Sequence, residues 1–256
     1  MSSEVLSHKP LVEAIFQLRW KLEGGDGEPP RDRHYRLLVG SLYDKLAEHY
    51  PYHEELPTAS VPDELVPYFP QHRFRTADGD WPLVQVGPGI LSLNETDGYM
   101  WAGFEGRALS MVEALYASHP DGKELQTEGL TLRYIDAVSL DTPEQDPLDF
   151  LRRYLKTDVG LEPSLFEGTG VVPRPAQLDL RFSFSTGEPA GFMHIRFSLG
   201  HAEREGSVLW ETAVESSAEN APRDPSDIGT WLRAAHGLTH DWFFKLIKGE
   251  LRERFQ

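Results

Sequence analysis

Apolar and polar side chains alternate along several stretches of the chain, most clearly in residues 12–22. Apolar side chains occupy every second position there, namely Val12, Ala14, Phe16, Leu18, Trp20 and Leu22. Because successive side chains of a strand point to opposite faces, this pattern predicts a strand with one buried face. The same alternation marks residues 130–140, 178–185, 193–199 and 208–214. Such strands are typical of an antiparallel sheet that is covered on one face only.

Apolar residues at helical spacing predict four helices. The first covers residues 33–50 and the second covers residues 102–117. A short third helix opens at Asp146, whose carboxylate can accept hydrogen bonds from the first turn. The last helix follows the predicted cap Ser226. Its apolar stripe consists of Ile228, Leu232, Ala235, Thr239, Trp242, Phe243 and Leu246.

The chain between the first two helices has a different pattern. Residues 51–70 contain five prolines and predict an irregular crossing, because proline donates no ladder hydrogen bond and interrupts helices. Two strands are expected after it, at His72–Thr76 and Pro82–Asn94. Gly87-Pro88-Gly89 interrupts the second strand and predicts a bulge or bend within it.

The predicted elements define an α+β protein in which antiparallel sheets are backed by helices. Their order is β-α-β-β-α-β followed by α-β-β-β-α, with a long C-terminal helix. The polar, proline-marked stretch 141–147 is the best internal boundary. It divides the chain into an N-terminal half, residues 1–143, and a C-terminal half, residues 144–256. The pattern leaves open whether these halves form one continuous domain, and whether they share one sheet or build two.

The charge balance argues against polyanionic partners. Of 256 residues, 25 are lysine or arginine and 41 are aspartate or glutamate, which gives a net charge of −16 with histidines neutral. Binding to nucleic acids and to anionic membranes depends largely on lysine and arginine, so neither partner is expected. The sequence contains no cysteine and no long uncharged apolar stretch. Together these features favour a soluble, cytoplasmic protein.

No cofactor or metal is expected from the motifs. Gly87-Pro88-Gly89 begins like a glycine-rich phosphate loop but continues as a strand where a helix would have to start. His236 and His240 are four residues apart on one face of the last helix, a spacing that zinc sites use. The sequence motif supplies no third or fourth metal ligand, so a packed or capping pair of histidines is the simpler interpretation.

Asp136 is the most unusual residue, because it stands on the apolar face of its strand between Tyr134 and Val138. A carboxylate there must be hydrogen-bonded, paired with a cation or raised in pKa. The simpler expectation is an ion pair, for which the candidate cations are Arg19, Arg133 and Arg181. A perturbed acid in a cleft is instead a site candidate. Asp136, Trp101 and His236 are therefore the predicted lining of a ligand pocket, and no catalytic set is predicted.

Four segments together resemble one family. They are Pro10-Leu11-Val12-Glu13-Ala14, the block Trp81–Trp101, the strand Leu132-Arg133-Tyr134-Ile135-Asp136, and the last helix with His236 and Phe243. In these segments the chain resembles a sporadically distributed family of uncharacterised bacterial and archaeal proteins of similar length. The pattern of that family more often carries asparagine at position 136. The sporadic distribution implies a defence or toxin–antitoxin setting.

Two functions are expected from these observations. The first is a non-enzymatic protein-interaction module, whose partner is another protein or a second copy of the chain. Its acidic surface can steer a basic partner towards it. The alternative is a small-ligand-binding protein or enzyme, with a pocket between the sheet and the C-terminal helix.

Overall fold

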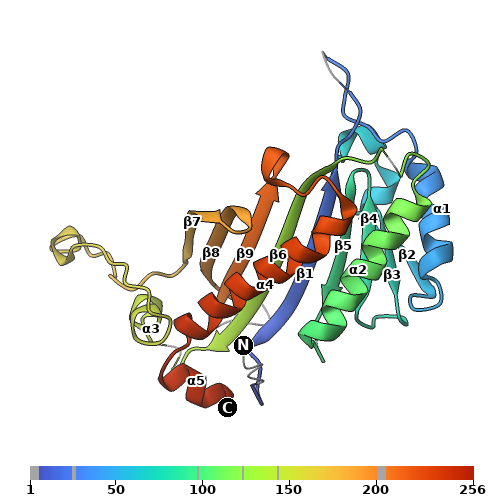
Figure 1. Ribbon diagram of the computed structural model, residues 1–256. Coiled ribbons are helices and arrows are strands. Elements are labelled where there is room, and N and C mark those ends of the chain that lie inside the picture. Colours follow the sequence, from blue (N-terminus) through green and yellow to red (C-terminus); the bar gives the residue numbers. More distant parts are fainter. Residues whose placement is uncertain (1–5, 25–26, 97, 123, 143, 201–205) are drawn as a thin grey trace.

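One antiparallel sheet runs through the molecule, with helices on one of its faces (Figure 1). The computed structural model describes residues 6–24, 27–96, 98–122, 124–142, 144–200 and 206–256. Within these residues the sheet has nine strands, and five α-helices accompany it. The chain is therefore α+β, as its patterning predicts.

The bounds of the elements are as follows. The strands are β1 (Leu11–Trp20), β2 (Tyr52–Glu55), β3 (His72–Arg75), β4 (Leu83–Gly87), β5 (Ile90–Glu95), β6 (Thr127–Ser139), β7 (Asp179–Gly187), β8 (Ala190–Leu199) and β9 (Ser207–Ser217). The helices are α1 (Tyr35–Leu46), α2 (Trp101–Ser118), α3 (Pro147–Tyr154), α4 (Pro225–Leu246) and α5 (Glu250–Phe255).

The strands follow the order β2-β3-β4-β5-β1-β6-β9-β8-β7 across the sheet. The first strand therefore lies near the middle, between β5 and β6. Strand β6 pairs with β9 from Gly129↔Ser217 to Ser139↔Ser207. Since β6 precedes the predicted boundary and β9 follows it, the two predicted halves share one sheet. The boundary position, Pro143, lies outside the described residues.

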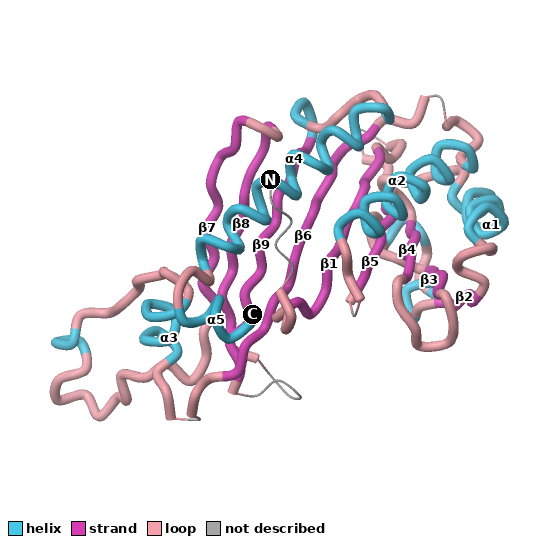
Figure 2. Tube along the Cα trace, turned by 60° about the horizontal axis from the view of Figure 1, so that its bottom comes forward, coloured by secondary structure: helices cyan, strands magenta, loops and turns pink. Residues whose placement is uncertain are grey.

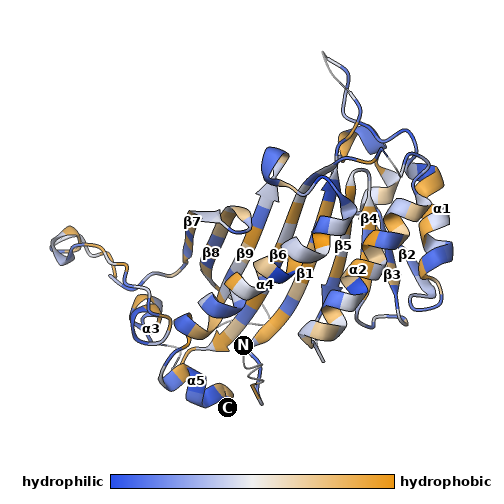
Figure 3. Cartoon of the chain, in the orientation of Figure 1, coloured by the Kyte–Doolittle hydropathy of each residue, from blue (hydrophilic) through white to orange (hydrophobic). Residues whose placement is uncertain are grey.

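Helices α1, α2 and α4 lie on the same side of the sheet (Figures 1 and 2). Helix α4 contacts β6 and β9, while α2 contacts β5 and α1 contacts β3. Hydrophobic and hydrophilic residues alternate along the strands, most visibly along β1 (Figure 3). Each strand thus turns one set of apolar side chains towards the helices, and burial of that set holds the two layers together.

The apolar interior divides into two clusters. The larger one lies under α1, α2 and α4, and its fully buried members include Phe16, Leu132, Leu232 and Val214. The smaller one lies between α3, α5 and the strands β8 and β9, around Trp210. The larger cluster contains residues from both predicted halves, so the same core stabilises both.

The sheet face opposite the helices is lined by paired charges. Arg19 Nη2 lies 2.9 Å from Glu215 Oε1, and the Arg133 guanidinium lies 3.6 Å from the Glu211 carboxylate. Asp179 at the edge is paired with Arg181 and Arg196. This largely polar face explains the alternation of the strands, because apolar residues are needed mainly on the helix-covered face.

Several expected boundaries differ from the structure. The predicted strand Pro82–Asn94 is two strands, because Gly89, at a φ of 80°, reverses the chain so that Gly87 pairs with Ile90. The prediction of a bend within a single strand was wrong. Part of the proline-rich segment pairs with β3 as the short strand β2. A further helix, α5, follows α4.

Of the two predicted helix caps, one is confirmed and one was wrong. The Asp146 side chain accepts a hydrogen bond from the backbone N–H of Leu148, which confirms it as the cap of α3. Helix α4 starts earlier than expected, because Asp224 and not Ser226 is its cap. The Asp224 carboxylate accepts from the backbone N–H of Ser226, and Pro225 occupies the first turn, where proline is favoured. In the described ranges, no helix is both long and apolar enough to traverse a lipid bilayer.

Candidate functional site

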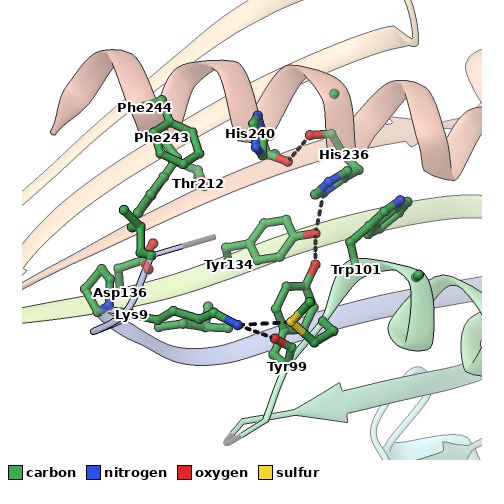
Figure 4. A pocket seen from close by; sticks show the side chains of 17 residues that line it. Lys9, Tyr99, Trp101, Tyr134, Asp136, Thr212, His236, His240, Phe243 and Phe244 are labelled. Carbon is green, nitrogen blue, oxygen red and sulfur yellow. Dashed lines mark hydrogen bonds between the residues drawn. The ribbon is translucent and has the colours of Figure 1, made fainter. Parts of the chain in front are cut away.

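A cavity of about 490 Å³ opens where the N-terminal segment, the start of α2, strand β6 and helix α4 meet (Figure 4). Most of its wall is apolar, with Leu6, Leu11, Met100, Trp101, Phe243 and Phe244 contributing. The polar side chains that reach it are Lys9, Tyr99, Tyr134, Asp136, Thr212, Thr239, His236 and His240. Concave, mostly apolar cavities of this size with a few polar groups are typical of small-molecule sites.

The three residues predicted to line a pocket all line this cavity. Trp101 is the first residue of α2, Asp136 lies in β6, and His236 lies in the middle of α4. They meet because α4 contacts both β6 and α2. The indole of Trp101 and the imidazole of His236 stack, with ring centroids 3.7 Å apart and planes 4° from parallel.

Asp136 is almost completely buried, with 2% of its surface exposed. Among the atoms that the structure describes, its Oδ2 has no hydrogen-bond partner. Burial raises the pKa of this carboxyl to about 8, because an apolar environment disfavours the charged form. A carboxyl of this kind takes up and releases protons near neutral pH.

The expected ion pair of Asp136 with an arginine was wrong. Arg19 lies against Glu215, Arg133 against Glu211 and Arg181 against Asp179. The reason is the two-residue repeat of a strand: Arg133 is an odd number of positions from Asp136 and therefore points to the opposite face of β6. The pairing of β1 and β6 aligns Arg19 with Gly129, which also belongs to that opposite face.

A chain of hydrogen bonds crosses the wall of the cavity beside Trp101 (Figure 4). The hydroxyls of Tyr99 and Tyr134 are 2.8 Å apart, and the Tyr134 hydroxyl is 3.0 Å from Nδ1 of His236. Burial, together with the nearby His240, lowers the pKa of His236 to about 4. Burial also raises the pKa values of both tyrosines. At neutral pH these three side chains are therefore uncharged and present only hydrogen-bonding groups.

Lys9 stands at the rim and points away from Asp136 (Figure 4). Its Nζ donates to the backbone carbonyl of Tyr99 at 2.6 Å and lies 3.5 Å from Sδ of Met100. The lysine thus ties the N-terminal segment to the loop that precedes α2. The Lys9 ammonium therefore does not neutralise the Asp136 carboxylate.

The histidine pair on α4 is packed into the wall. His236 contacts Tyr134 and Trp101, and its ring centroid lies 5.6 Å from that of His240. In the described ranges, no three histidine, cysteine, aspartate or glutamate side chains gather as metal ligands would.

Sequence reasoning missed several of the polar groups around the cavity. Tyr134 stands two residues before Asp136 on the same face of β6, so periodicity could have named it. Thr212 follows from the pairing of β6 with β9, which aligns it with Tyr134. Lys9 and Tyr99 lie outside regular elements, and no periodic signal marks them.

Comparisons with known proteins add little to this description. No protein-family model matches the chain, and no curated protein matches it. A solved structure of Methanococcus jannaschii TBP aligns with 88% of this chain and 98% of its own, at 12% identity and a TM-score of 0.25. That score is too low to carry an argument about fold or function, so the site has to be interpreted from its own chemistry.

Proposed function

We propose that this protein binds a small, mostly apolar molecule in the cavity between α2, β6 and α4. The observation that carries the proposal is the unpartnered Oδ2 of Asp136 in a mostly apolar wall. Burial of a polar group without a partner costs a few kcal/mol, and side chains in that state concentrate at functional sites. A bound molecule supplies the missing partner and covers the exposed parts of Trp101 and Met100.

The interaction-module role stays a prediction. The feature that bears on it is the segment between α3 and β7, which extends away from the sheet (Figure 1). Its exposed apolar side chains are Leu161, Leu165, Val171 and Val172. The ligand-binding proposal rests on the cavity and does not depend on this segment.

A substitution that fills the cavity without disturbing the fold tests this proposal. Gly237 lines the cavity from α4, and a Cβ built there meets no other atom within 4 Å. The Gly237→Leu variant should therefore occupy the cavity and fold normally, since leucine is a better helix former than glycine. Gly106→Leu is the matched control, because Gly106 is an exposed glycine of α2 with the same free space around its Cβ.

Binding is measured with N-phenyl-1-naphthylamine, a neutral dye that fluoresces in apolar surroundings. The wild type and Gly106→Leu should bind it equally, and Gly237→Leu should bind it about tenfold more weakly or worse, because the added side chain and the dye need the same space. Equal binding by all three proteins, or no binding by the wild type, would refute the proposed function.

A further inference from the structure

Among the described residues that line the cavity, one side chain is acidic and no cation neutralises it. Asp136 is the only aspartate or glutamate among the described residues that line the cavity. Its Oδ2 faces no hydrogen-bond donor of the described chain. Only 2% of the Asp136 surface is exposed, and a ligand group that contacts this carboxyl from the cavity supplies the partner that the described chain lacks.

The other titratable groups that face the cavity do not supply that partner. They are Lys9, Tyr99, Tyr134, His236 and His240. Lys9 is held at the rim by the Tyr99 carbonyl and Met100. The hydroxyl of Tyr134 lies between Tyr99 and Nδ1 of His236, so it is already engaged on both sides.

Aromatic rings form much of the remaining wall. Tyr99, Trp101, Tyr134, Phe243 and Phe244 all line the cavity (Figure 4). Aromatic faces attract cations, and they do so more strongly where water is excluded. A carboxyl among aromatic rings therefore selects a positively charged group attached to an apolar body.

We propose that the ligand carries a protonated amine, which forms an ion pair with the carboxylate of Asp136 while its apolar part packs among the aromatic side chains. This inference rests on the proposed function, because it needs the cavity to be a binding site. In the free protein the carboxyl is mostly protonated at pH 7, since its pKa is about 8. Binding then ionises it: the carboxyl O–H bond breaks, the proton goes to solvent, and the carboxylate accepts hydrogen bonds from the ammonium.

Three indoles that differ in charge test this step. Tryptamine is cationic, tryptophol is its neutral alcohol, and indole-3-acetate is an anion with the same ring. Isothermal titration calorimetry on the wild type should show tryptamine binding about tenfold more tightly than tryptophol, and indole-3-acetate weakest, because only the cation satisfies the buried carboxylate. The tryptamine affinity should rise between about pH 6 and pH 8, and the heat should depend on the buffer, since a proton is released.

Asp136→Asn separates charge from shape. The asparagine variant should lose about tenfold in tryptamine affinity and keep its tryptophol affinity, because the amide preserves the volume of the side chain without its charge. Its binding of the neutral dye reports whether the cavity is intact.

The outcomes distinguish the two proposals. Equal affinity for tryptamine and tryptophol would overturn the amine assignment and leave the proposed function standing. The amine assignment would also be overturned if the protein bound the neutral dye but not tryptamine. It would be overturned as well if indole-3-acetate bound most tightly of the three, because an anion would then be preferred, with Lys9 as its partner. Loss of all binding, including that of the dye, refutes the proposed function itself.

Discussion

At the scale of single residues, Asp136 shows how one side chain acquires its properties from the face on which it stands. The helix-covered face of its strand is apolar at Leu130, Leu132 and Val138. The arginines that could neutralise it lie on the other face of the sheet, where they pair with glutamate and aspartate. The carboxyl is thus isolated by the geometry of the strand, although Arg133 lies on the same strand and Arg19 on the neighbouring strand β1.

The pH dependence of stability follows from this isolation. Between the unfolded pKa of about 4 and the folded pKa of about 8, the folded state holds the Asp136 proton that the unfolded state releases. This contribution of Asp136 to stability is therefore complete at low pH and is lost as the pH rises through this window.

We expect Asp136→Asn to become increasingly more stable than the wild type as the pH rises. The difference in the free energy of unfolding should grow by at most about 1.4 kcal/mol per pH unit between about pH 4 and pH 8. Urea denaturation of both proteins at several pH values measures it. A difference that stays constant over this range would contradict the buried, uncharged carboxyl.

At the scale of elements, α4 determines where the cavity lies. Asp224 caps the helix, and the helix contacts α2, β6 and β9. This course brings His236 over β6 and next to the first residue of α2, Trp101. The position of His236 therefore depends on the path of the whole helix.

The pairing of β8 with β9 provides a test at the same scale. Gly191 of β8 comes so close to β9 that a Cβ there would lie 2.1 Å from the carbonyl oxygen of Glu215. Gly187 of β7 belongs to the same hairpin, and a Cβ there meets nothing within 4 Å.

Gly191→Ala should destabilise the protein, whereas Gly187→Ala should have little effect. Relief of the clash requires β8 or β9 to move, which costs about 1–3 kcal/mol or more. Gly187→Ala, where the added methyl group has free space, should change the free energy of unfolding by no more than about 0.5 kcal/mol. Urea midpoints of both variants measure the contrast, and similar midpoints would show that the strands do not approach so closely.

At the scale of the whole molecule, the sheet and the larger core join the two predicted halves. Strand β6 of the first half pairs with β9 of the second half along its length. The larger cluster combines Leu42 and Phe104 of the first half with Trp231 and Leu232 of the second. Neither half can lose its structure without exposing apolar surface and backbone groups of the other.

Unfolding should therefore occur in one cooperative transition. Tryptophan fluorescence and far-ultraviolet circular dichroism should give the same urea midpoint, because the tryptophans are spread over both halves and the shared sheet couples them. Two separate transitions, or midpoints that differ between the probes, would show that the halves fold independently.

The sequence by itself determined the alternation of the strands, the helical stripes and therefore the α+β class. It also marked Asp136 as a carboxyl on an apolar face, and it named Trp101 and His236 as possible neighbours. These features are local, because they follow from the two-residue repeat of strands and the spacing of helices. Short pairing segments such as β2 and the tight β4–β5 turn were missed, because four residues or one glycine leave too short a pattern.

Only the tertiary structure decided which of these residues meet. The strand order places β6 between β1 and β9, and α4 packs over β6, where Asp136 lies. Lys9 and Tyr99 join the cavity from loops whose paths no periodicity encodes. Contacts between residues far apart in the chain depend on how the layers pack, and packing reflects the shape of the whole core.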